Sequence, residues 1–81
     1  MPILLAEDGY EFRFFSNDRS EPPHVHVRGN GGRAKIWLAP SVKLGPAHAY
    51  TAQRRGEILR KAEAHRDEWL ARWSRHFGTG R

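Results

Sequence analysis

Apolar side chains repeat with two different periods along this chain, and the change of period limits the folds it can adopt. Over residues 3–39, short runs alternate between apolar and polar positions and are separated by Gly, Pro, Asn and Asp, as in β-strands joined by turns. Residues 52–77 lack proline, and a stripe at steps of three and four residues contains Ile58, Ala62, His65, Trp69 and Trp73. The pattern predicts an α+β fold: a small antiparallel β-meander of about four strands, with one long C-terminal helix packed on one face.

The turn residues divide the first half of the chain into four expected strands, at residues 3–6, 10–15, 24–29 and 33–39. Asp8-Gly9 and the glycine-rich turn after residue 28 are typical of hairpins, while Pro22-Pro23 favours an extended entry into the third strand. Residues 41–44 are a candidate for one more short strand, but Pro46 argues against regular structure beyond them. We expect one domain, with a sheet (1–39), a connector (40–50), a helix (51–77) and a frayed tail (78–81).

Composition narrows the class of protein. The chain has 14 Lys and Arg against 9 Asp and Glu, a formal charge of +5, and residues 54–81 alone hold eight of the bases and four of the acids. This balance favours a polyanion or an acidic protein as partner, and a solvated helix face is the alternative explanation. The absence of Cys excludes disulfides and thiolate zinc sites. No segment resembles a membrane span or a signal peptide, so we expect a cytoplasmic protein that does not bind membranes.

The segment EPPHVHV, residues 21–27, places two histidines on one face of the expected third strand and two valines on the other, because side chains alternate along a strand. Pairing with the fourth strand as a hairpin extends both faces. The side chains expected to face the helix are Val25, Val27, Ile36 and Leu38. Those expected on the open face are His24, His26, Lys35 and Trp37.

Two imidazoles on one face have three interpretations. As acid and base near neutral pH, His24 and His26 would serve metal-free RNA cleavage, with Lys35 stabilising the phosphorane-like charge and Asp18 or Glu21 orienting an imidazole. A metal site needs further ligands, and none of its candidates has a diagnostic spacing: Asp18, Glu21 and His48. The third interpretation is that the histidines only hydrogen-bond to neighbours or line a protein interface. We predict no metal and no cofactor, and the expected binding residues are Arg28, Arg33 and Trp37.

Three blocks of the sequence carry a resemblance to a known family: F-x-F-F-S-N-D-x-x-E-P-P-H-V-H-V at residues 12–27, A-K-I-W-L at residues 34–38 and W-x-x-x-F at residues 73–77. Over nearly its whole length the chain resembles a small bacterial family known as domain of unknown function 4160. Members are often encoded beside a second small protein, as a type II toxin–antitoxin pair. The resemblance therefore implies a toxin-like chain with a small antitoxin-like protein as its cognate partner, and it supplies no established catalytic residues.

The basic charge, the shared His/Lys/Trp face and this resemblance together make RNA or the translation machinery the expected target. The alternative is a non-catalytic module that binds protein or nucleic acid with the open face of its sheet.

Overall fold

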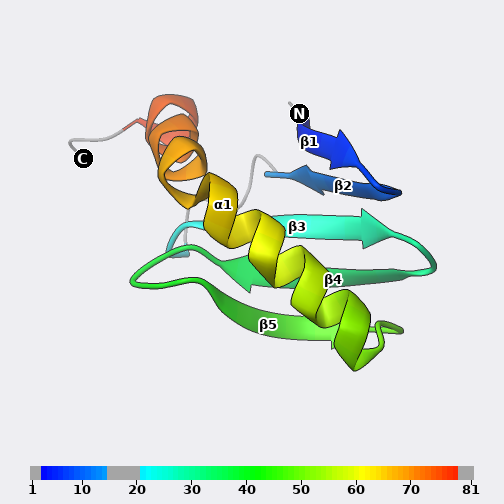
Figure 1. The fold of residues 1–81 in the computed structure, drawn as a ribbon. Helices are drawn as coiled ribbons and strands as arrows, with labels where there is room; N and C mark the ends of the chain where they lie inside the picture. Colours follow the sequence, from blue (N-terminus) through cyan, green and yellow to red (C-terminus); the bar gives the residue numbers. More distant parts are fainter. Residues whose placement is uncertain (1–2, 15–20, 79–81) are drawn as a thin grey trace.

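The structure, a computed structural model, describes residues 3–14 and 21–78 of the chain. It shows an antiparallel sheet of five strands followed by one helix (Figure 1). The strands lie side by side in chain order: β1 (Ile3–Glu7), β2 (Tyr10–Arg13), β3 (His24–Gly29), β4 (Gly32–Trp37) and β5 (Lys43–His48). The helix is α1 (Ala52–Phe77). The predicted α+β meander with a long C-terminal helix is therefore confirmed.

Two tight turns join the first four strands into two hairpins. Asp8 and Gly9 join β1 to β2, Asn30 and Gly31 join β3 to β4, and all four have positive φ angles between 51° and 83°. Two successive positive φ angles are characteristic of the type I′ turn, whose twist matches that of a two-stranded hairpin. The two turns also touch, because the Asn30 side-chain amide donates a hydrogen bond of 3.0 Å to the carbonyl of Asp8. Both hairpins that the sequence predicts are present.

The fifth strand lies inside the segment that the sequence predicted to be a connector. β5 pairs with β4 from Lys43 to His48, so residues 40–50 do not form a connector throughout, and Pro46 does not end the regular structure. The register shifts between the positions opposite Ala34 and Ile36, which leaves Gly45 and Pro46 together opposite the single residue Lys35. Such a bulge at an edge strand accommodates a proline, because the N–H that proline lacks is not needed for the ladder there.

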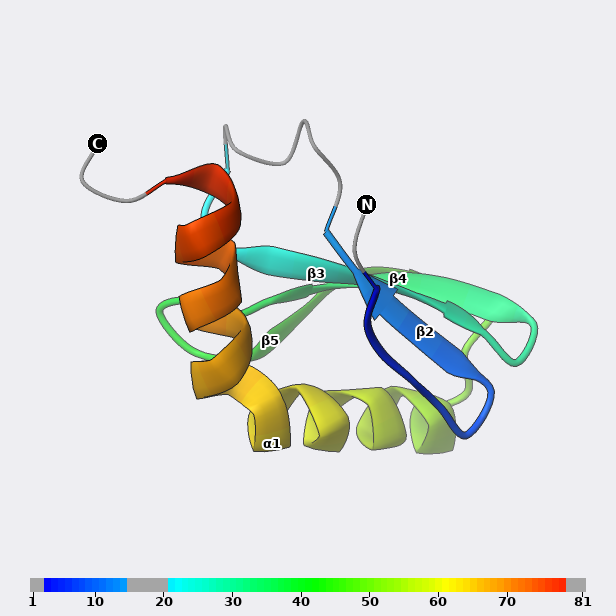
Figure 2. The ribbon, with the colours of Figure 1, turned by 90° about the horizontal axis from the view of Figure 1, so that it is seen from above.

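The helix begins at a side-chain cap and bends before it ends. The hydroxyl oxygen of Thr51 accepts a hydrogen bond of 3.1 Å from the backbone N–H of Arg54, as expected for an N-cap residue. The first half of α1 lies along one face of the sheet, and the second half turns past the start of β3 (Figure 2). The bend brings the C-terminal half of the helix against the end of the sheet where the two histidines lie.

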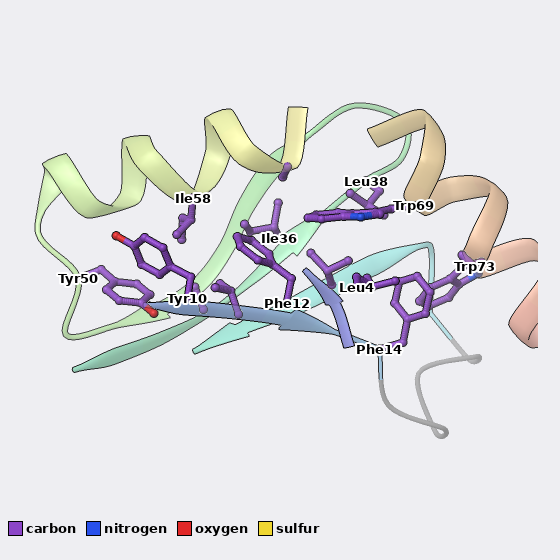
Figure 3. Close-up of a cluster of buried hydrophobic side chains, with 14 residues drawn as sticks. Leu4, Tyr10, Phe12, Phe14, Ile36, Leu38, Tyr50, Ile58, Trp69 and Trp73 are labelled. Carbon is purple, nitrogen blue, oxygen red and sulfur yellow. The ribbon is translucent and has the colours of Figure 1, made fainter. Parts of the chain in front are cut away.

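The core fills the space between α1 and the sheet (Figure 3). Phe12, Ile36 and Leu38 from the sheet side and Ile58 and Trp69 from the helix are completely buried. Val25 and Val27 are also buried, so all four side chains predicted to face the helix do so. The ring of Phe12 packs on the indole of Trp69 with centroids 5.2 Å apart. No helix in the described part of the chain is long and apolar enough to cross a membrane.

Candidate functional site

The face of the sheet opposite α1 carries polar side chains in three rows that run across the strands. Residues paired across neighbouring antiparallel strands project to the same side, so the strand register defines each row. Row one, from β2 to β5, contains Glu11, Arg28, Arg33 and His48. Row two, from β2 to β4, contains Arg13, His26 and Lys35. Row three, from β3 to β5, contains His24, Trp37 and Lys43.

A pocket of about 480 Å³ lies on this face and is lined by residues of rows one and two. Its wall on the β5 side is formed by Pro46, which lies in the bulge of that strand, and by the next residue, Ala47. Because these side chains are small and apolar, the pocket combines an apolar wall with a charged rim. Its size is that of a site for a small ligand or for one unit of a polymer.

The charge of rows one and two is mainly positive. These rows contain four cationic side chains and one carboxylate, Glu11. It accepts a hydrogen bond of 2.8 Å from Arg13 and lies 3.3 Å from Nε of Arg28, while Lys35 pairs with Glu21 outside the rows. The side chain of Arg28 is nevertheless 72% exposed. Arg33 forms no ion pair with any residue in the described ranges.

The two arginines of row one face each other across β3 and β4. Arg28 and Arg33 are direct register partners, and like charges in this position repel. An anion bound between the two guanidinium groups would remove the repulsion and gain charge-assisted hydrogen bonds. Glu11 offsets part of this charge through Arg28, and the exposed pair still offers hydrogen-bond donors to an anionic ligand.

Row three shows that one prediction about the histidines was wrong. We predicted His24 on the open face, but only 1% of this residue is exposed. Its imidazole lies 5.3 Å from the indole of Trp37 and 5.3 Å from that of Trp73, measured between ring centroids. The reason is the bend of α1, whose second half turns past the start of β3 (Figure 2) and places Trp73 in contact with His24. His26, two residues further along β3, remains partly exposed and lines the pocket.

The hydrogen bond of His24 fixes which ring nitrogen carries a proton. Nδ1 lies 2.9 Å from the carbonyl oxygen of Pro22, and since a carbonyl can only accept, Nδ1 must donate. Nε2 lies 3.8 Å from a carboxylate oxygen of Glu21. The imidazole thus fastens the backbone of the proline pair to the start of β3, which is a structural use of the residue.

Glu21 connects the two sequence blocks that define the site. Its carboxylate accepts a hydrogen bond of 2.5 Å from the ammonium group of Lys35, and that group also lies 4.3 Å from the centre of a ring of Trp37. His24 and His26 lie beside this pair, with their ring centroids 5.0 Å apart. The EPPHVHV and AKIWL blocks therefore meet on one end of the sheet.

Most of the predicted site residues come together. The structure brings Glu21, His24, His26 and Lys35 into one cluster, and it makes Arg28 and Arg33 direct partners in row one. Trp37 is partly buried in row three, next to the cluster. Asp18 lies outside the described residues. Within residues 3–14 and 21–78, no group of three His, Asp or Glu side chains is placed to hold a metal ion.

Sequence reasoning did not assign Glu11, Arg13 and His48 to the charged face, and it considered His48 only as a metal ligand. The first two could have been found, because strand alternation places them opposite the buried side chains of Tyr10 and Phe12. His48 could not, since no sequence signal indicated a strand beyond Pro46. It joins row one only through the bulge in β5.

Comparison with known proteins identifies one family. The family model described as Domain of unknown function (DUF4160) matches residues 9–74, a range that includes both sequence blocks that meet at the site. No curated protein and no solved structure matches this chain.

Proposed function

The chain belongs to the DUF4160 family, and we propose that it is an RNA-binding protein, the toxin-like half of a toxin–antitoxin pair, which holds RNA on the open face of its sheet. The observation that carries the proposal is the charged face itself: four cationic side chains and two histidines lie around one pocket, and among the described residues only two carboxylates, Glu11 and Glu21, pair with them. RNA phosphates are bound mainly by such Lys and Arg clusters. A cytoplasmic location, where RNA is available, belongs to the same proposal.

The aromatic rings beside the cations favour a nucleic acid over an acidic protein. Row one places two guanidinium groups opposite each other, and the planar donors of arginine match phosphate oxygens. The face also holds partly exposed His26 and Trp37, and aromatic rings are the side chains on which unpaired bases stack. A sheet that offers both kinds of group resembles, in its chemistry, the platforms that bind single strands.

Fluorescence anisotropy with a labelled single-stranded RNA tests the binding. We expect Arg28→Ala/Arg33→Ala to weaken binding by about tenfold or more and to lower the salt slope by about 0.7, because the two arginines together hold one phosphate. The matched control is Arg60→Ala/Arg75→Ala, which removes two exposed arginines from α1 and changes the net charge equally. Equal losses in the two double variants would show that only total charge matters, and the proposed face would be wrong.

Growth of bacteria that express the chain without any partner tests the toxin part. The unmutated chain should slow growth, Arg28→Ala/Arg33→Ala should relieve the effect, and the control pair on α1 should not. If the unmutated chain leaves growth unchanged, the toxin part fails, and the binding result stands by itself.

Cleavage of the bound RNA is a second candidate, favoured by the pairing of a histidine with a lysine in row two. His26 and Lys35 are direct register partners beside the pocket. In this reaction the 2′-oxygen would attack the neighbouring phosphorus and its proton would pass to His26, while the bond to the 5′-oxygen breaks and that oxygen takes up a proton from the ammonium group of Lys35. Lys35 would stabilise the charge on phosphorus. Glu21 holds Lys35 in place, and the buried His24 acts on the backbone instead of on RNA.

The products distinguish cleavage from binding alone. Cleavage should give fragments with 2′,3′-cyclic phosphate ends, and His26→Ala should abolish them while RNA affinity changes little. RNA that is bound but stays intact would identify the chain as a non-catalytic nucleic-acid-binding module.

A further inference from the structure

The pocket and the two charged rows have a geometry that specifies the form of the nucleic acid. We infer that the pocket receives one unpaired nucleotide of a single strand, whose two flanking phosphates lie on row one and row two. The inference rests on the proposed function and names the substrate class more narrowly, since it excludes a duplex as the preferred ligand.

The spacing of the rows supports one phosphate on each. Arg28 and His26 are alternate residues on β3, and Arg33 and Lys35 are alternate residues on β4, so the rows lie about 6.6 to 6.8 Å apart along the strands. Successive phosphates of an extended single strand have a comparable separation. A strand that runs along β3 and β4 would therefore meet the paired arginines at one phosphate and Lys35 with Arg13 at the next.

The pocket accounts for the base between the two phosphates. Its volume of about 480 Å³ exceeds what two phosphate contacts alone require. Pro46 and Ala47 supply an apolar wall, and the ring of His48 at the end of row one supplies an aromatic surface. A base that is free to leave its stack can enter such a pocket, whereas a paired base inside a helix cannot.

Substitutions of His48 distinguish experimentally between binding of the base and binding of the phosphates. It is exposed at the edge strand β5, so its replacement does not disturb the core. His48→Ala removes the ring, while His48→Phe keeps an aromatic ring and removes the titratable nitrogens. A base held against the ring should distinguish these two variants, whereas a phosphate held by charge alone should not.

Anisotropy with a single-stranded trinucleotide, and with the same molecule lacking its central base, provides the test. We expect loss of the base to weaken binding by about 10- to 100-fold, which is the usual contribution of one stacked base. His48→Ala should weaken binding of the intact trinucleotide by a similar factor, leave the abasic form almost unchanged, and be rescued by His48→Phe. Thermal unfolding of each variant shows whether it is folded.

The outcomes separate this inference from the proposed function. If intact and abasic trinucleotides bind equally, or if a duplex of equal charge competes as well as the single strand, the seating of a base is wrong while RNA binding by the face survives. If neither trinucleotide nor a longer RNA binds, both proposals are wrong.

Discussion

The imidazole of His24 packs against the indole of Trp73, with ring centroids 5.3 Å apart. This contact joins the first histidine of the EPPHVHV block to the C-terminal half of α1. His24 is therefore held from three directions: by Trp73 on the helix, by Trp37 on β4 and by the carbonyl of Pro22. Its neighbour His26 shares the same strand but lines the pocket, so the two histidines have different tasks.

Removing His24 should destabilise the protein more than removing His26. His24→Ala leaves a cavity and an unpaired carbonyl, and we expect the free energy of unfolding to fall by about 2 to 3 kcal/mol. His26→Ala, at a partly exposed position, should cost under about 1 kcal/mol. Urea unfolding of both variants measures the difference, and equal losses would contradict the structural role of His24. Functional tests should accordingly use His26→Ala alone, because a double variant confuses unfolding with loss of activity.

Two glycines of the β3–β4 hairpin should respond very differently to alanine. Gly29 has a φ of 129°, and a Cβ there would lie 1.9 Å from the carbonyl oxygen of Gly9. Since the clash is with backbone, Gly29→Ala should lower the free energy of unfolding by about 3 kcal/mol or more. Gly31→Ala is the matched control, because φ is 83° but nothing lies within 4 Å of its Cβ, so only the cost of a left-handed residue, about 1 to 2 kcal/mol, remains. Thermal unfolding of both variants checks the order.

The helix cap gives a third prediction. Thr51 accepts the hydrogen bond from the N–H of Arg54, so Thr51→Ala should cost about 1 kcal/mol of stability. Thr51→Ser keeps the hydroxyl group and should retain most of the stability that the cap contributes. Chemical denaturation measures both, and a loss of the same size in the serine variant would show that the methyl group matters and the cap does not.

Tyr50 should make the protein less stable in alkaline solution. Burial raises the pKa of the Tyr50 hydroxyl above its usual value of about 10, and the nearby Tyr10 adds to the shift while Arg54 opposes it. Above about pH 10 the unfolded chain releases this proton while the folded protein keeps it, so the stability contributed by the hydroxyl is complete below that pH and is lost as the pH rises.

The Tyr50→Phe variant isolates this effect. It should be less stable by about 1 kcal/mol at neutral pH, because the hydroxyl donates a hydrogen bond of 2.8 Å to the carbonyl of Gly29. Between about pH 9 and 11 its stability should fall less steeply than that of the unmutated protein. Urea unfolding across this range is the measurement, and parallel curves would mean that Tyr50 does not titrate differently in the two states.

The hairpin of β3 and β4 and the core behind it could be predicted from the sequence, because their signals are local. Alternation assigns Val25 and Val27 to the core, and the Asn30-Gly31 turn places His26 opposite Lys35. Two features could not be predicted. The burial of His24 depends on where a helix about 50 residues away bends, and the strand status of His48 depends on a bulge that hides the alternation of β5.

The bulge at Gly45 and Pro46 also bears on how copies of this molecule meet. β5 is one edge of the sheet, and an incoming strand from a second copy would need an unbroken series of backbone donors there. Pro46 offers none, and the extra residue puts the rest of β5 out of step with a straight partner. Aggregation by strand addition is therefore disfavoured at the β5 edge, beside the pocket. The edge strand at which a second copy can still add is β1, on the opposite side of the sheet.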